Sequence, residues 1–148
     1  MADMPPLAKC VYFWLALADF IMNVRGGFVA FSIIPHLAAK VKMFFALAPS
    51  YTLQYTKSVI LQLTRLPEPL LKTTPPLYDI EAITIPIAMW SGGQDWASQP
   101  PEIAQLRHRI TNLIHEKKFP EWNHWDFIWG LDAASCLYKE ILALMATL

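Results

Sequence analysis

The sequence predicts an α/β fold, a small parallel sheet with helices on both faces. Two short apolar runs bounded by proline, glycine or polar residues indicate strands at residues 41–49 and 83–90, and a third strand is expected at 112–120. Segments in which apolar residues recur at helical spacing lie before, between and after these runs. Strands that alternate with helices are joined by right-handed crossovers, so the strands lie parallel and the helices cover both faces of the sheet.

In the first half of the chain, a helix is expected over residues 28–34, after a pair of glycines. Pro35 either opens the first turn of a continuation or ends the helix, because proline fits a first turn but has no N–H to donate farther in. The run VKMFFALAP at 41–49 is the first buried strand, and residues 55–66 have the apolar spacing of a second helix.

In the second half, the strand at 83–90 is apolar and β-branched, with Pro86 better placed near its start than at its centre. Residues 100–110 begin with two prolines, which suits the first turn of a surface helix. A third, shorter strand is expected at 112–120.

The chain closes with an amphipathic helix at 132–148, for which Asp132 is the expected N-cap. The spacing of its apolar residues predicts which side chains face the core: Leu137, Ile141, Leu144 and Met145.

Two units are expected, a divergent apolar segment at 1–26 and an α/β domain at 27–148 with a joint near 67–79, where prolines cluster. Residues 10–18 fit either a weak signal peptide or an apolar helix packed on the body. A membrane span is the poorer interpretation, because Asp19 and Asn23 interrupt a stretch too short for the hydrocarbon core.

Composition excludes several functions. Twelve acidic and twelve basic residues cancel, so the chain has no electrostatic footprint for nucleic acid. Cys10 and Cys136 are expected to be buried free thiols, and no zinc spacing is present. Three further histidines share no metal-ligand spacing and are expected to be solvated, and no cofactor is indicated. These are His36, His108 and His115.

Two polar residues follow the second and third predicted strands. Asp95 comes after a Gly-Gly turn, and His124 stands in the loop before the last helix. Each alone is more typical of a turn or a packed ring than of catalysis. Functional groups of parallel sheets gather beyond the carboxyl ends of the strands, however, and the order Asp then His matches the end of a Ser…Asp…His triad. Asp95 and His124 are therefore the candidate catalytic residues.

Aromatic residues surround this histidine. They are expected to line the core and a pocket, with a lipid-contacting patch as the second interpretation. Asn123 is expected to cap the loop, and Asp126 to form a hydrogen bond within it rather than to take part in catalysis. The tryptophans concerned are Trp90, Trp96, Trp122, Trp125 and Trp129.

The stretches YDIEAITIPIAMWSGGQDWASQP and IHEKKFPEWNHWDFIWGLDA resemble the C-terminal part of the acid lipases, the gastric and lysosomal acid lipase family of α/β-hydrolases. Residues 27–72 also resemble that family, from the helix after the nucleophile to the start of the cap. The resemblance implies Asp95 as the triad acid and His124 as the base. It also implies a lipid ester substrate, no cofactor, no defined protein partner, and a family that is secreted or lysosomal.

The sequence departs from the family in two places. The family carries its serine in a G-x-S-x-G elbow, whereas MNVRGG stands there and the serine position falls near Ile21. At Lys72-Thr73, where the family has a lid, the chain continues directly. The resemblance therefore implies a truncated lipase that is catalytically silent because its serine nucleophile is absent. The alternative is a non-catalytic hydrolase fragment that binds lipid or a partner.

Overall fold

The computed structural model describes residues 24–50, 55, 57 and 79–148. The predicted N-terminal segment at 1–26, the helix predicted over 55–66 and the joint near 67–79 lie almost entirely outside these residues. Within the described part, no helix is long and apolar enough to cross a membrane.

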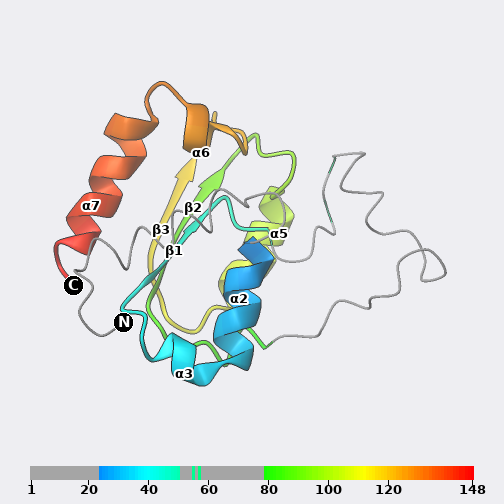
Figure 1. Ribbon diagram of the computed structural model, residues 1–148. Coiled ribbons are helices and arrows are strands. Elements are labelled where there is room, and N and C mark those ends of the chain that lie inside the picture. Colours follow the sequence, from blue (N-terminus) through cyan, green and yellow to red (C-terminus); the bar gives the residue numbers. More distant parts are fainter. Residues whose placement is uncertain (1–23, 51–54, 56, 58–78) are drawn as a thin grey trace.

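Within the described residues, three parallel strands form the sheet in the order β1-β2-β3 (Figure 1). They are β1 (Phe44–Leu47), β2 (Ile87–Gly92) and β3 (Leu113–Phe119), so the predicted parallel α/β sheet is confirmed. Pro86 lies just before β2, where its carbonyl accepts the N–H of Phe44 at 2.8 Å. A proline at this point uses its acceptor and needs no donor, as expected.

The third strand is the longest of the three strands in the described residues. It has seven residues, against four in β1 and six in β2, so the prediction of a shorter strand is wrong. β3 is an edge strand whose residues alternate between partly buried and exposed, and it includes His115, Glu116 and Lys117. An apolar run identifies a strand buried on both faces, but it does not detect the polar half of an edge strand.

The first helix begins four residues before the predicted start and includes the glycine pair that was expected to precede it. α2 is Val24–Ile33, and Pro35 opens a separate short helix, α3 (Pro35–Ala38). α5 (Pro100–Arg109) begins at the two prolines, as expected. Its Glu102 is nevertheless fully buried, so this helix is not a surface helix throughout.

The end of the chain differs from a single amphipathic helix. A short helix, α6 (Asp126–Trp129), is followed by a π-helix, η1 (Ala134–Tyr138), and then by α7 (Lys139–Met145). Asp132 is not a side-chain cap. Its backbone carbonyl instead accepts the N–H groups of Ser135 and Cys136, at 3.0 and 2.9 Å.

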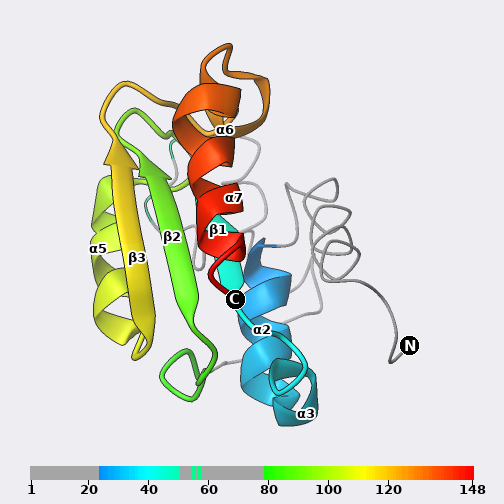
Figure 2. The same cartoon turned by 90° about the vertical axis from the view of Figure 1, so that its left-hand side faces the viewer.

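Helices cover both faces of the sheet, as predicted. Figure 1 shows α7 on one side and α2 with α5 on the other, and in the turned view of Figure 2 α7 lies in front of β1. Alternation along the strands divides the core accordingly. Phe44 and Met89 pack with α2 and α5, whereas Phe45 and Trp90 pack with η1 and α7. Of the four predicted inward residues, Leu137 and Ile141 are buried, and Leu144 and Met145 are partly buried against them.

Two smaller predictions fail. Cys136 is exposed rather than buried, and Cys10 lies outside the described residues. His115 is not simply solvated, because its ring lies 4.9 Å from that of Trp90 and its Nε2 is 3.4 Å from a carboxylate oxygen of Glu140. His36 and His108 are exposed, as expected.

Ala48 has a left-handed backbone directly after β1, with φ 45°. This conformation costs roughly 1–2 kcal/mol for a residue that carries a Cβ. The residue is fully buried and fixed by two hydrogen bonds: its N–H donates to Trp90 O at 2.8 Å, and its carbonyl accepts the hydroxyl of Ser98 at 2.8 Å. The end of β1 is thereby tied to β2 and to the loop that follows β2.

Two alanine-to-glycine variants in this segment test the strain at Ala48. Ala46→Gly removes a buried methyl group and loosens the unfolded chain, so we expect its free energy of unfolding to fall by about 1–2 kcal/mol. Ala48→Gly has the same costs but relieves the left-handed strain, so we expect its free energy of unfolding to change by less than about 1 kcal/mol. Urea denaturation measures both, and equal losses in the two variants would contradict the assignment.

An exposed ion pair ties the segment before β2 to the end of α5. Arg109 donates two hydrogen bonds to Glu81, at 2.7 and 2.8 Å, and these hold the pKa of Glu81 at about 2 instead of 4.5. Because the folded pKa is lowered, the stabilisation is complete above the unfolded pKa and is lost as the pH falls toward 2. Solvent screening keeps such a pair below about 1 kcal/mol.

We therefore expect Glu81→Gln to be slightly less stable than the parent chain at pH 7. The difference in stability should fall below about half of its pH 7 value at pH 3 and should be nearly lost at pH 2. Denaturation midpoints of both chains between pH 7 and pH 2 measure this. A difference that stays constant over that range would show that the pair does not act through its charge.

Candidate active site

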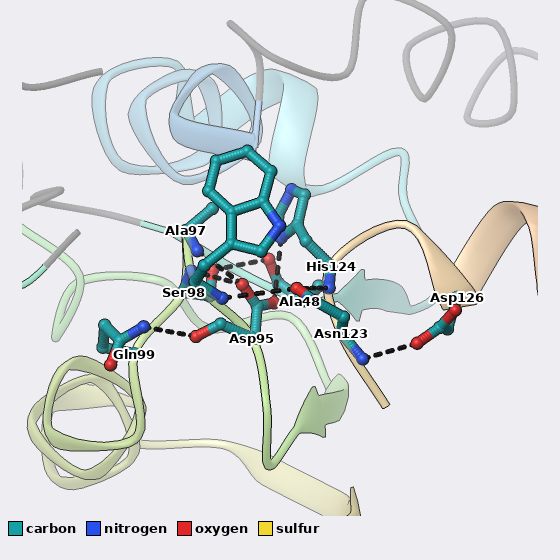
Figure 3. Close-up of polar contacts among 9 residues, drawn as sticks. Ala48, Asp95, Ala97, Ser98, Gln99, Asn123, His124 and Asp126 are labelled. Atoms are coloured by element: carbon teal, nitrogen blue, oxygen red, sulfur yellow. Dashed lines mark hydrogen bonds and ion pairs between the residues drawn. The ribbon is translucent and has the colours of Figure 1, made fainter. Parts of the chain in front are cut away.

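Asp95 and His124 meet beyond the carboxyl ends of β2 and β3. Oδ2 of Asp95 lies 2.9 Å from Nδ1 of His124 (Figure 3). The side chain of Asp95 is fully buried and that of His124 is 8% exposed. The contact expected from the sequence is therefore present, and it spans 29 residues of chain.

The carboxylate of Asp95 is fixed by its own loop. Its other oxygen, Oδ1, accepts the backbone N–H groups of Ala97 and Ser98, both at 2.7 Å, as Figure 3 shows. The side-chain amide of Gln99 donates to the Asp95 carbonyl. Two backbone donors on one oxygen compensate a buried negative charge, which leaves the second oxygen to face the imidazole.

The Gly-Gly pair brings the two loops together. A Cβ on Gly92 would lie 2.4 Å from Trp122 O, and one on Gly93 would lie 2.2 Å from Pro120 O. Neither glycine has a positive φ, so the requirement is close backbone approach rather than a special turn. The N–H of Gly93 donates to Phe119 O at 2.8 Å, and this contact fixes the start of the Asp95 loop against the end of β3.

The His124 loop is organised by Asn123. Its side-chain oxygen accepts the N–H of His124 at 2.7 Å and, more weakly, that of Trp96 at 3.4 Å, so one amide joins the two loops. Its own N–H donates to Oδ2 of Asp126 at 2.6 Å. The expected hydrogen bond of Asp126 within the loop is thus present, whereas α6 begins without a side-chain cap hydrogen bond.

Packing of aromatic rings holds the His124 loop against the end of β3. Trp122 stacks on Phe119 with ring centroids 4.0 Å apart, and Phe127 meets Trp122 edge-on at 5.1 Å. Tyr138 of η1 donates its hydroxyl to Phe127 O at 2.6 Å, and burial raises the pKa of that hydroxyl. Trp90 and Trp122 are buried in the core, as the first interpretation of the tryptophans requires, whereas Trp129 is 71% exposed.

Sequence reasoning did not find a second polar cluster, on the face that α7 covers. Glu140 receives hydrogen bonds from Lys117 at 2.8 Å and from the indole of Trp90 at 3.2 Å. Burial opposes the charge of Glu140, but these donors outweigh it and lower its pKa. Since the partners come from β2, β3 and α7, no local pattern could have indicated this cluster, which joins the sheet to the last helix.

The arrangement suits proton transfer. An ionised Asp95 that accepts the Nδ1–H of His124 makes Nε2 the basic ring nitrogen, which is the tautomer required of a general base. The described residues contain no group of three His, Cys, Asp or Glu side chains that could hold a metal ion.

Comparison with known proteins gives matches to lipases. The chain is 53% identical over 72 residues to lipase member M of Homo sapiens, which is 49% of this chain and 17% of that protein. It is 45% identical over 73 residues to gastric triacylglycerol lipase of Mus musculus, 49% of this chain and 18% of the relative. No family model matches the chain.

A longer match extends to the lysosomal acid lipase/cholesteryl ester hydrolase of Rattus norvegicus, 29% identical over 216 residues. That match includes 80% of this chain, which is about 118 of its 148 residues. About 98 of the 216 positions in the matched region are therefore opposite gaps in this chain. The chain spans 54% of that relative's length and less than a fifth of the other two. With its parallel α/β sheet, these matches relate the chain to the acid lipase family of α/β-hydrolases.

Proposed function

We propose that this chain is a lipid ester hydrolase scaffold in which Asp95 and His124 occupy the places of the charge-relay acid and base. The observation that carries the proposal is the 2.9 Å contact between the buried Asp95 carboxylate and Nδ1 of His124, at the carboxyl edge of a parallel sheet. The relatives named as triacylglycerol lipase and cholesteryl ester hydrolase support carboxylic esters of lipids as the substrate class.

In this proposal the two residues have different tasks. Asp95, held by two backbone N–H groups, orients the ring and stabilises the imidazolium that forms when His124 accepts a proton. In a complete triad, the residue in the place of His124 removes the proton from the nucleophile and returns it to the leaving alcohol. Asn123 joins the two loops, which helps to keep Nδ1 of His124 within hydrogen-bond distance of the Asp95 carboxylate.

The nucleophile is the part that this chain does not supply. The sequence contains no G-x-S-x-G elbow. Three of the described serines donate hydroxyl hydrogen bonds to backbone carbonyls: Ser32 to Val29, Ser98 to Ala48 and Ser135 to Asp132. Ser91 lies within β2 and is 3% exposed. We therefore propose that these 148 residues have no hydrolytic activity by themselves.

A second candidate function follows from the same features. Without a nucleophile, the scaffold can still bind lipid or a partner through the aromatic loop that carries His124, in which Trp129 is 71% exposed. The two candidates differ in one measurement, the turnover of an ester.

We expect no hydrolysis of a short-chain ester above a heat-denatured control, and a His124→Ala variant indistinguishable from the parent. The physical reason is that a triad works as a unit. In subtilisin, loss of the serine alone costs about a million-fold in kcat. Labelling with a fluorophosphonate probe provides an independent readout. Turnover that disappears in His124→Ala would contradict catalytic silence. The next variants to assay would then be Ser91→Ala and Ser50→Ala, since the buried hydroxyl of Ser50 has no hydrogen-bond partner within the described residues.

The relay pair itself can be tested without turnover. We expect ¹⁵N NMR of the imidazole to show the Nδ1–H tautomer of neutral His124 in the parent and a mixture of tautomers in Asp95→Ala. Asp126→Ala is the matched control, because that carboxylate binds the N–H of Asn123 in the same loop and should leave the ring tautomer unchanged. A parent chain with the proton on Nε2 would exclude the proposed roles.

A further inference from the structure

An aromatic ladder runs from the candidate site to the surface. The ring of Trp125 meets that of His124 edge-on, with centroids 6.0 Å apart, and stacks on Trp129 at 4.7 Å with an interplanar angle of 13°. Two residues beyond Trp129, Leu131 follows the end of α6. We call Trp125, Trp129 and Leu131 the aromatic tip.

The outer part of this tip is unusually open. Among the described residues, Leu131 (105%) and Trp129 (71%) are the two most exposed large hydrophobic side chains. Single exposed apolar residues are common on protein surfaces. Here two of them project from one short segment, and stacking on Trp125 fixes one of them in place, so the tip is a preformed apolar protrusion.

The area of the tip favours a lipid surface over a protein partner. A stable protein interface buries roughly 800 Å² on each side, whereas an aromatic side chain contributes about 150–250 Å². Trp129 and Leu131 therefore fall well short of a protein interface. Insertion into a fluid lipid surface needs no complementary groove, and tryptophan prefers the boundary between apolar chains and water.

The charge near the tip decides which kind of lipid it fits. Residues 121–132 contain three acidic side chains and neither lysine nor arginine. Such a segment is repelled by an anionic membrane and tolerated by a neutral surface. The acidic residues are Glu121, Asp126 and Asp132.

We propose that the aromatic tip inserts Trp129 and Leu131 into the surface of an electrically neutral lipid assembly, with the Asp95–His124 edge of the sheet toward that surface. The choice of lipid as partner rests on the proposed function, whereas the insertion itself requires no catalysis. The ring of Trp125 contacts both the buried His124 and the inserted Trp129. The lipid-contacting side chain and the candidate catalytic histidine therefore lie on the same short segment of the chain.

Flotation of the full chain with phosphatidylcholine vesicles at pH 7 tests this proposal. We expect Trp129→Ala and Leu131→Ser each to weaken partitioning about tenfold, and the double variant about a hundredfold, since each removes one inserted apolar side chain. Leu142→Ser is the matched control. That residue is 58% exposed on α7, away from the tip, and its variant should partition like the parent. Circular dichroism verifies that all variants remain folded.

Several outcomes would overturn the proposal. They are a parent chain that does not float, a double variant that partitions like the parent, an equal loss in Leu142→Ser, and stronger binding when phosphatidylserine is added. Self-association that depends on the tip while vesicle binding does not would assign the tip to a second copy instead. Flotation is separable from the proposed function, because tip-dependent binding can hold or fail whatever ester turnover shows.

Discussion

The candidate site depends on the backbone contact between the loops that leave β2 and β3. Gly92 and Gly93 lie so close to the carbonyls of Trp122 and Pro120 that no side chain could stand between them. Two backbone hydrogen bonds use this closeness, from Gly93 to Phe119 and from Gln94 to Trp122. A larger residue at either glycine would separate the loops and with them the carboxylate and the imidazole, although neither catalytic candidate would have changed. Contacts between main-chain atoms therefore determine how closely the two loops, and with them Asp95 and His124, approach each other.

The sequence predicted the features that depend on local chemistry. Apolar runs at 41–49 and 83–90 indicated the two strands buried on both faces, because a parallel strand covered by helices must be apolar throughout. Asp95 and His124 could be paired because both follow strands of one parallel sheet, whose carboxyl ends share an edge.

Features that depend on tertiary contacts were not predictable in the same way. β3 mixes charged and apolar residues, and its length becomes understandable only once Glu140 of α7 is seen beside Lys117. Asp132 has the side chain of an N-cap, yet the chain there enters a π-helix whose first residues bond to its backbone carbonyl. The role of Asn123 as a link between loops depends on Trp96, 27 residues away, which no spacing rule could indicate.

The π-helix also sets the rotational phase of the end of the chain. Each residue advances an α-helix by about 100°, so the wider turn of η1 accommodates one residue more than an α-helical turn would. With that residue in place, Tyr138 faces the carbonyl of Phe127, while Leu137 and Ile141 still point into the core. A deletion of one residue in this turn would leave composition and amphipathic character almost intact, but every side chain after it would be turned away from its present neighbour. In this segment residue count, more than residue identity, keeps the last helix in phase with the loop that carries the histidine.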